Sequence, residues 1–577
     1  MSGRRRAVLA ASLAAALVLA LPAVAWAHAA LLRTSPSASG VLSGPPGRLI
    51  LTYTEPIAPK LAIVSVTDVG GHRVTAGSPQ RAATNANELV VPLRRVPEGW
   101  YLVFWRVISA DGHPVRGAFT FAVGPSPGPA PQFVIPSTSE TAATTQLLIA
   151  RWIVFLSLMT AIGLFVLRTL IARPLLRLLP GSSLRAVSVA LASALLVALV
   201  ATPVYVVLAT AQFTLRSAFS LGAIVPLVRA SSFGRDFLDL ELVTALFAVA
   251  AAVAIVLDRP ERPQRSVAAL LALVGALGAA AAALVVPGLA GHAAYTPPRG
   301  ASLPLDWLHL AAGSIWIGGL LGLVAIWKTS GTFGRVATLA IVVPRFSRVA
   351  FASVFLLLGS GIGASVLHLP TLGSLWQTSY GKALVVKIVL LAAALLLAGV
   401  NLARTKPRLE AAGVRPGLGE GAAVLLRRLV TGEIVFVVGA LFAAAVLTSL
   451  APPSKALAQA GKASARVGPG PVTQVVNKNG YRLQFRVSPN RAALPNSFAV
   501  KISRGGKPVR GAEVVARFAM LDMEMGQQEY RLPERNPGVF ARAAPALVMV
   551  GHWGLFYEIT PPGKQPFTVL LLDRASG

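Results

Sequence analysis

A histidine directly follows a cleavage pattern of small residues near the start of the chain. A basic segment and an apolar run precede Ala25-Trp26-Ala27, which is the layout of a secretory signal peptide. We therefore expect residues 1–27 to be removed and His28 to become the N-terminus. A terminal histidine offers its α-amine and a ring nitrogen to one metal ion, which closes a chelate. The alternative is an uncleaved first transmembrane helix.

A second histidine has an acidic neighbour, in Asp111-Gly112-His113. On a strand, Asp111 and His113 would share one face, whereas a bend at the glycine would aim both side chains at one point. Together with a terminal His28 they form the nitrogen-rich donor set that suits Cu(II). Taken alone, the tripeptide is also consistent with a surface turn, so the terminal histidine is what favours the metal site.

Three further histidines stand near the ends of long apolar runs. His309 shares a helix face with Asp306, three residues before it, and Trp316 lies seven residues along that face. His292 and His368 lie near the same predicted membrane face. Ionisable groups at this depth usually mark a site or a pathway. The structural alternative is that the histidines form hydrogen bonds at the interface and that Trp316 belongs to the core.

Methionines cluster near the end of a chain that contains only six of them. The cluster consists of Met520, Met523, Met525 and Met549, and His552 follows three residues later. Thioethers are soft ligands that select Cu(I), although methionine is also a common core filler. Because the chain has no cysteine, a soft-metal site has to use histidine, methionine or carboxylate.

Composition places these groups in a membrane protein. Only 13% of the 577 residues are charged and 54% are hydrophobic, which rules out a purely soluble enzyme and a disordered polyelectrolyte. The net charge of +31 does not indicate a nucleic acid partner, because the basic residues recur in short groups between apolar runs. The chain has no P-loop, G-x-S-x-G or H-E-x-x-H motif, and we predict no enzymatic activity.

Eight apolar runs between residues 146 and 450 have about the 20 residues that a membrane-spanning helix needs. The runs cover residues 147–167, 187–209, 241–257, 267–287, 305–327, 350–367, 383–403 and 430–450. The third run is short, and the half-apolar segment 213–240 before it is consistent with a re-entrant or a surface helix. Lys387 lies in the seventh run, where snorkelling to the interface and a functional role are equally consistent.

Strand-like runs flank the membrane part. Residues 28–124 contain short β-rich runs and predict a small β-sandwich. Residues 472–577, with strict alternation over 481–487, predict a second one. The Pro-rich residues 125–145 and the residues 451–471 are expected to be linkers. The predicted fold class is a multi-domain membrane protein, with an N-terminal β-sandwich, an eight-helix transmembrane bundle and a C-terminal β-sandwich.

Charge also predicts the orientation of the chain in the membrane. Arginine and lysine concentrate in alternate loops, beginning with the loop after the first span, and this places those loops in the cytoplasm. All seven histidines then lie outside or near the outer membrane face. We therefore expect a multi-pass protein of the cytoplasmic (inner) membrane with both terminal domains extracytoplasmic, handling a ligand on that side.

Three stretches of the N-terminal domain resemble the CopC family of periplasmic copper-binding domains. They are Ala27-His28-Ala29-Ala30-Leu31, Leu51-Thr52-Tyr53-Thr54-Glu55-Pro56 and Ala110-Asp111-Gly112-His113-Pro114-Val115-Arg116-Gly117. The resemblance covers residues 28–124. It implies that His28, Asp111 and His113 bind Cu(II) and that Glu55 supports the site.

The remaining parts of the chain resemble two further families. Residues 146–450 are similar to the CopD family of copper-resistance membrane proteins, most clearly in Leu305-Asp306-Trp307-Leu308-His309 and Tyr380-Gly381-Lys382. Residues 478–572 look like a YtkA-like domain. The CopD resemblance implies copper movement across the inner membrane, with His292, Asp306, His309 and His368 as the candidate path.

These observations predict copper binding outside the cytoplasm and copper transport, in the import direction, contributing to copper homeostasis and resistance. The expected cofactors are Cu(II) at the N-terminal domain and Cu(I) at the C-terminal cluster. The expected partners are the copper ion, the lipid bilayer and periplasmic copper carriers. Two alternatives remain, which are periplasmic copper sequestration with the membrane part as an anchor, and a membrane redox protein that uses haem or copper.

Overall fold

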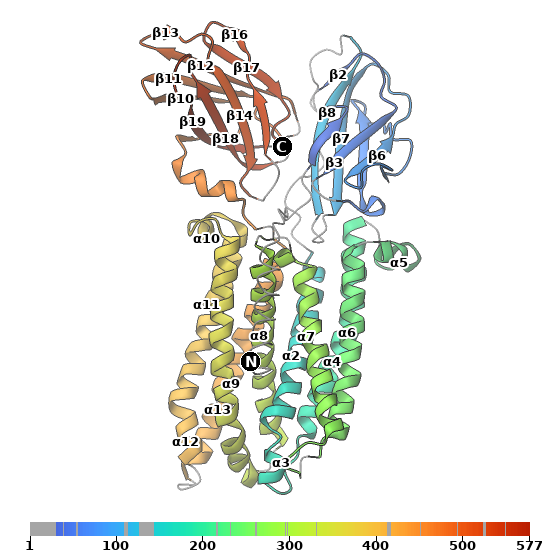
Figure 1. Cartoon of the computed structure of the whole chain (residues 1–577), viewed down its shortest axis with the longest axis vertical. Helices are drawn as coiled ribbons and strands as arrows, with labels where there is room; N and C mark the ends of the chain where they lie inside the picture. The colour runs from blue at the N-terminus through green and yellow to red at the C-terminus, as the bar shows by residue number, and fades with distance from the viewer. Residues whose placement is uncertain are drawn as a thin grey trace, which may run out of the picture.

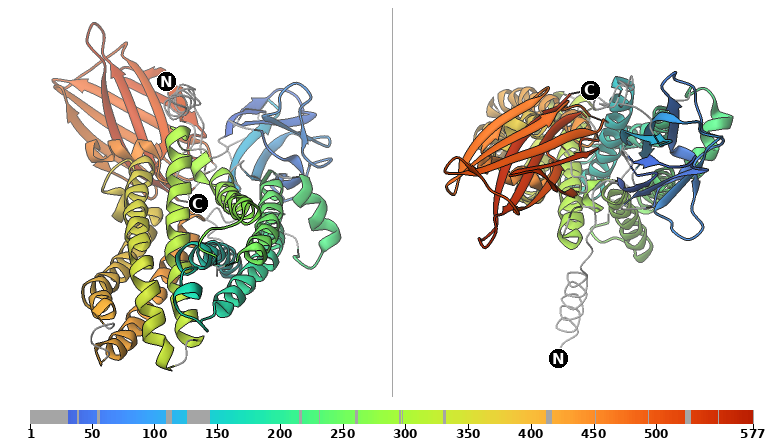
Figure 2. Two further views of the ribbon diagram at one scale, coloured as in Figure 1. Left: turned by 60° about the horizontal axis from the view of Figure 1, so that its bottom comes forward. Right: turned by 90° about the horizontal axis from the view of Figure 1, so that it is seen from above.

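Two small β domains stand side by side at one end of a bundle of long helices (Figures 1 and 2). The computed structural model describes residues 31–37, 40–53, 56–108, 114–125, 144–214, 217–230, 232–259, 262–294, 296, 298–329, 332–411, 417–450, 452–492, 494–522, 527–548 and 550–576. The two β domains are in contact. The backbone amide of Ala118 in the first donates to the carbonyl oxygen of Val548 in the second, at 3.4 Å.

The N-terminal domain is a sandwich of two four-stranded sheets, as predicted. One sheet contains, in spatial order, β1 (Leu31–Ser35), β3 (Arg48–Tyr53), β6 (Glu88–Pro92) and β5 (Gln80–Arg81). The other contains β2 (Val41–Leu42), β8 (Pro114–Val123), β7 (Gly99–Ile108) and β4 (Ile63–Asp68), with the short helix η1 (Pro59–Leu61) before β4. Alternate residues of β3, which are Leu49, Leu51 and Tyr53, point into the core between the sheets.

The C-terminal domain is a second sandwich, which confirms the predicted fold class. Its first sheet contains β10 (Val472–Lys478), β11 (Tyr481–Ser488), β12 (Asn496–Arg504), β17 (Val539–Ala544) and β16 (Glu534–Asn536), with β13 (Lys507–Pro508) paired to β12. Its second sheet contains β15 (Gln528–Arg531), β14 (Glu513–Met520), β18 (Gly551–Thr560), β19 (Phe567–Ala575) and β9 (Ala465–Arg466). The alternation expected over 481–487 is the inward face of β11.

The segment 451–471, expected to be a linker, carries structure instead. It contains the 3-10 helix η5 (Lys455–Lys462) and strand β9, which pairs in parallel with β19. Leu457 of η5 packs with Leu521, Phe556 and Leu570 of the sandwich. The burial of these side chains ties the segment to the C-terminal domain, and no apolar run in the segment is long enough to signal it from sequence.

The membrane part consists of long helices, and eight of those in the described residues are long and apolar enough to span a bilayer. The long helices are α2 (Thr145–Val166), α4 (Arg185–Thr214), α6 (Ser232–Leu257), α7 (Val267–Leu289), α8 (Arg299–Thr329), α9 (Thr332–His368), α11 (Ser379–Val400) and α13 (Gly417–Leu447). Shorter elements join them, which are η2 (Leu167–Ile171), α3 (Leu175–Leu178), α5 (Leu221–Ala230), η3 (His292–Ala294), α10 (Ser374–Gln377), η4 (Asn401–Thr405) and α12 (Lys406–Ala411). The predicted number of spans is confirmed.

Several predicted boundaries were wrong. The third span is not short, because α6 begins at Ser232, and Phe233 and Phe237 pack their rings against Tyr205 of α4. Only residues 221–230 of the segment 213–240 form a separate helix, α5, which lies beside the bundle near the N-terminal domain (Figure 1). Helices α9 and α13 begin well before residues 350 and 430, so Arg345, Arg348, Arg427 and Arg428 of the predicted cytoplasmic loops lie within these helices.

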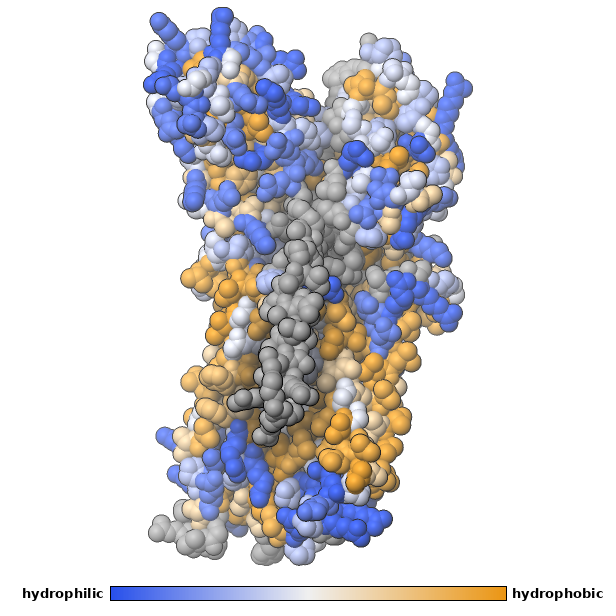
Figure 3. Space-filling view, viewed as in Figure 1, coloured by the Kyte–Doolittle hydropathy of each residue, from blue (hydrophilic) through white to orange (hydrophobic). Residues whose placement is uncertain are grey.

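The surface of the helical part carries a broad apolar belt with hydrophilic residues at both ends (Figure 3). Exposed Leu, Val and Phe side chains on α4, α6, α7, α9 and α11 make up this belt. At the end away from the β domains, Asp258 pairs with Arg173 at 2.9 Å and with Arg265 at 3.5 Å. An apolar belt bounded by charge is the surface of a multi-pass membrane protein.

Helix α8 is the central helix of the bundle and packs closely against α2. A methyl group added at Gly163 of α2 would overlap the carbonyl oxygen of Ser314 on α8, and Gly318 of α8 faces Gly163 from the other side. Small residues at such crossings let two backbones approach within van der Waals contact. This contact fixes the position of α8, which carries Asp306, His309 and Trp316.

Candidate functional site

The predicted N-terminal ligands His28, Glu55, Asp111 and His113 lie outside the described residues. The strands from which they continue lie together, however. Leu31 at the start of β1 pairs with Tyr53 at the end of β3. The ring of Tyr53 meets that of Trp105 on β7 edge to face, with centroids 5.7 Å apart. The described strand ends of β1 and β3 are therefore neighbours, and β3 packs against β7 across the core.

This end of the N-terminal domain faces the helices. Ile108 at the end of β7 and Leu61 of η1 belong to the same apolar cluster as the helix bundle. The guanidinium of Arg106 donates to the carbonyl oxygen of Gln212 near the end of α4 at 3.1 Å. Ile108, the last residue of β7, pairs with Pro114, the first residue of β8. The end of β7 and the start of β8 therefore both lie next to the membrane part.

The histidines of the predicted membrane path lie at the bundle end that carries the β domains. His368 closes α9, its Nδ1 lies 2.7 Å from the carbonyl oxygen of Ala364, and its Nε2 lies 3.2 Å from the hydroxyl of Thr296. Its ring stacks on Tyr380, with centroids 6.3 Å apart. His292 is buried, and its Nε2 lies 3.1 Å from the carbonyl oxygen of Leu450.

His309 lies deeper, on α8, and contacts a lysine. Its Nδ1 lies 3.2 Å from the carbonyl oxygen of Leu357 and 3.2 Å from the hydroxyl of Ser360. A carbonyl oxygen only accepts, so Nδ1 carries the proton and donates. The other nitrogen, Nε2, then has its lone pair directed at the ammonium of Lys387, 3.3 Å away. The ammonium of Lys387 therefore contacts the ring nitrogen of His309 that a metal ion would use.

Glycines on two neighbouring helices make room for the polar groups of α8. A Cβ at Gly288 of α7 would lie 2.9 Å from a carboxylate oxygen of Asp306, and one at Gly361 of α9 would lie 3.1 Å from the ring of His309. Asp306 also interacts with Lys387 through charge. Asp306, His309 and Lys387 therefore form one polar group inside the helix bundle, enclosed by α7, α9 and α11.

The predicted path is thus not one metal site. Among the described residues, no three His, Asp or Glu side chains are grouped so that they could hold a metal ion. The structure brings Asp306 and His309 together, and it adds Lys387, which sequence analysis left undecided. Its position inside an apolar run was the available signal, because intramembrane charges usually face a protein interior.

In the C-terminal domain, His552 of β18 forms an ion pair with Asp522. Its ring Nδ1 lies 3.0 Å from one carboxylate oxygen, and its backbone amide donates to the other at 2.7 Å. The hydrogen bond to Asp522 raises the pKa of His552 above its ordinary value, while burial and the charges of Arg574 and Arg466 oppose this. A carboxylate behind the ring is what metal-binding histidines commonly have, and it leaves Nε2 for a metal.

The methionine cluster is only partly described. Met520 belongs to the core of the sandwich and is 3% exposed. Its terminal methyl group lies beside Gly551, the neighbour of His552, where an added Cβ would approach it at 2.5 Å. Met523, Met525 and Met549 lie outside the described residues. Asp522 was missed by sequence analysis, although it stands between two of the predicted methionines.

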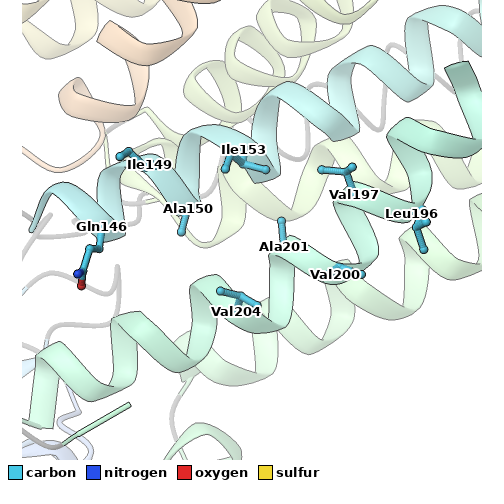
Figure 4. A pocket seen from close by; sticks show the side chains of 9 residues that line it. All are labelled: Gln146, Ile149, Ala150, Ile153, Leu196, Val197, Val200, Ala201 and Val204. Carbon is cyan, nitrogen blue, oxygen red and sulfur yellow. The ribbon is translucent and has the colours of Figure 1, made fainter. Parts of the chain in front are cut away.

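A groove between α2 and α4 is a feature of a different kind (Figure 4). It has a volume of about 640 Å³, and every side chain that lines it is apolar except Gln146. Val197, Val200 and Val204 of this lining are exposed on the apolar belt. The groove has no group that could bind a metal ion, and its chemistry matches lipid chains.

Comparison with protein families finds three matches along the chain. The CopC domain matches residues 31–124, Copper resistance protein D matches residues 340–447, and the YtkA-like model matches residues 476–557. The three families occur in the order that the sequence motifs predicted.

Relatives match both the whole chain and its first domain. The Copper transport protein CutJ of Bacillus subtilis is 25% identical over 540 residues, which cover 92% of this chain and 93% of that protein. Protein YobA of Escherichia coli K12 is 30% identical over 106 residues, 18% of this chain and 85% of that protein. Copper resistance protein C of Xanthomonas campestris is 32% identical over 107 residues, 18% of this chain and 84% of that protein. The solved structure of CopC from Methylosinus trichosporium, 29% identical, aligns with 18% of this chain and 100% of its own, at a TM-score of 0.17.

Proposed function

We propose that the chain, which matches the CopC, CopD and YtkA-like families in turn and is similar over most of its length to a copper transport protein, captures copper outside the cytoplasm and passes it inward through its helix bundle. One observation carries this proposal. The strand ends that lead to the predicted CopC ligands lie at the bundle end that holds His368 and, below it, His309.

Capture is assigned to the N-terminal domain. The α-amine and ring of His28, with Asp111 and His113, would bind Cu(II), and Glu55 would support them. The pairing of Leu31 with Tyr53 and the packing of Tyr53 on Trp105 support this grouping, because they hold the approaching strands together. Fusion of this domain to the bundle keeps the captured ion at a high effective concentration near the helices.

Transfer is assigned to the polar groups of the bundle. His292 and His368 lie nearer the β domains, and Asp306 and His309 lie farther along α8. The cargo ion would displace the ammonium of Lys387 from Nε2 of His309, since both positive groups require the same lone pair. The nearby carboxylate of Asp306, which interacts with Lys387 through charge, would offset part of the cost of placing a cation in the bilayer.

The driving force is assigned to the membrane potential. The chain has no nucleotide-binding motif. A potential that is negative inside favours entry of a cation by about 2.3 kcal/mol per charge for each 100 mV. With both β domains outside the cytoplasm, this potential would favour import of the cation.

The C-terminal domain is assigned a second copper site, for Cu(I). The contact of His552 with Asp522 supports it, because the carboxylate engages Nδ1 and leaves Nε2 for a metal ion. Met523, Met525 and Met549, with Met520 at the edge of the domain core beside Gly551, would supply soft sulfur donors.

Copper in separated cell fractions tests the transport proposal. Cells that express the intact chain should hold more cytoplasmic copper than cells without it, measured by elemental analysis. The His309→Ala chain should lose this gain, whereas His72→Ala should keep it, because the side chain of His72 is 84% exposed in the N-terminal domain and pairs with Asp68. A gain confined to the outer fraction would contradict transport and favour sequestration.

A further inference from the structure

A second buried polar pair lies in the bundle, away from the histidines. Glu433 of α13 is 2% exposed, and its carboxylate accepts a hydrogen bond from the side-chain amide of Asn401 at 3.3 Å. Among the described residues, Glu433 forms no ion pair with a lysine, an arginine or a histidine. A lone carboxylate inside a membrane bundle is costly, and such groups are usually functional.

Asn401 has an unused acceptor. Its amide carbonyl oxygen is buried and has no hydrogen-bond partner in the part of the chain that the structure describes. Asn401 is also the first residue of η4, a single turn of π-helix that follows α11. Single π-turns inside helices are rare and frequently occur at functional sites. The hydrogen bond to Glu433 of α13 accounts for the buried amide nitrogen of Asn401, but it does not account for the buried amide oxygen.

Both residues line a cavity in the bundle. The cavity has a volume of about 230 Å³, and Trp316 of α8 lines it together with Asn401, Glu433 and mostly apolar side chains of α9, α11 and α13. Trp316 follows His309 by seven residues, which is about 10 Å along a helix. Asp306, His309 and Lys387 are called the His309 group. The cavity therefore begins two helical turns from this group, on the side away from the β domains.

The depth of the pair places it in the other half of the membrane. Asn401 follows Lys387 by fourteen residues on one continuous helical segment, which corresponds to about 21 Å. The apolar core of a bilayer is about 30 Å thick. The His309 group and the Glu433–Asn401 pair thus stand at two levels of the bundle, and Trp316, which lines the cavity of the pair, lies on the same helix as His309.

We propose that Glu433 and Asn401 form an inner cation site, which receives copper from the His309 group through the Trp316 cavity. This inference rests on the proposed transport function. The site offers carboxylate and amide oxygens, which accept Cu(II) better than the softer Cu(I). The indole face of Trp316 would favour a cation in transit over an anion.

The experiment measures Cu(II) binding and copper uptake on the same full-length chain. Binding is measured by equilibrium dialysis of the purified chain with a Cu(II) salt and elemental analysis. Uptake is measured after reconstitution into vesicles with an inside-negative potential. The variants are Glu433→Gln, which removes the charge at nearly constant volume, and Asn401→Leu. The control is Glu420→Gln, an exposed carboxylate on the same helix.

We expect Glu433→Gln to bind one copper ion fewer per chain and to take up copper at least about tenfold more slowly, with Asn401→Leu changed in the same direction. Glu420→Gln should match the unmodified chain. Normal binding and uptake in both variants would overturn the inner site while leaving transport intact. No uptake by the unmodified chain, with one ion still lost in Glu433→Gln, would overturn transport and retain the site. No uptake and no lost ion would overturn both.

Discussion

The ammonium nitrogen of Lys387 lies 3.3 Å from Nε2 of His309. Nδ1 of the same ring is directed at the carbonyl oxygen of Leu357, so Nε2 is the nitrogen with the free lone pair. A lysine carried by α11 therefore holds the ring nitrogen on α8 that the proposed cargo would need. In the proposed transport, the cargo binds Nε2 only when the lysine leaves, and this relationship leads to the first prediction.

Replacing Lys387 with methionine should tighten Cu(II) binding at the His309 group by at least about tenfold, which corresponds to about 1.4 kcal/mol. The variant keeps the length of the side chain and removes the competing charge. Competition with a chelator of known affinity measures the effect. Lys382→Met is the matched control, because Lys382 is exposed and lies five residues earlier on the same helix. Equal affinity in the Lys387 variant and the control would contradict the competition.

A chain that keeps one extra residue before His28 should bind Cu(II) at the N-terminal domain much more weakly. The extra residue displaces the α-amine and opens the chelate ring, so the loss should reach at least about tenfold. A Cu(II) titration of the full-length chain with each N-terminus measures it. Unchanged affinity would show that the α-amine is not a ligand.

Replacing Gly163 with alanine should destabilise the bundle by about 1–3 kcal/mol, because the added methyl group overlaps the backbone of α8 at Ser314. Unfolding of the detergent-solubilised chain in increasing SDS measures the change. Gly275→Ala on α7 is the control, since nothing lies within 4 Å of a Cβ at that position. Similar stability of the two variants would show that α2 and α8 can separate without cost.

The C-terminal sandwich should become less stable as the pH rises from about 4 to about 6. Burial raises the pKa of Asp573 to about 6, despite a hydrogen bond from Asn490. The folded chain then binds more protons than the unfolded chain between these values, so unfolding becomes easier as the pH rises.

Asp573→Asn should remove this dependence and stabilise strand β19 on the order of 2 kcal/mol at neutral pH. Hydrogen exchange of β19 in both full-length chains, compared at each pH, measures the difference. The two chains should exchange alike near pH 4, where Asp573 is protonated. Equal exchange of the Asp573→Asn chain and the unmodified chain at neutral pH would mean that burial of the charged carboxylate does not destabilise the fold.

Much of this architecture can be predicted from local patterns in the sequence. The period-two alternation over residues 481–487 predicts β11, because alternate side chains of a strand face opposite sides of a sheet. Apolar runs of about 20 residues predict the membrane helices, because a helix must cross the bilayer core with its backbone bonds satisfied internally. The three family domains are likewise recognisable from short continuous motifs, and all three were confirmed.

The grouping of the candidate residues was decided by tertiary structure. Sequence spacing placed Asp306 and His309 on one helix face, but it could not indicate that Lys387 of α11 turns inward to meet them. It also gave no reason to connect Glu433 with Asn401, or His552 with Asp522. Local periodicity determines which face of an element is apolar, whereas its partner depends on how helices rotate and cross in the bundle. In this protein those rotations follow from close contacts such as that of Gly163 with α8, and they bring polar side chains of different helices together inside the bundle.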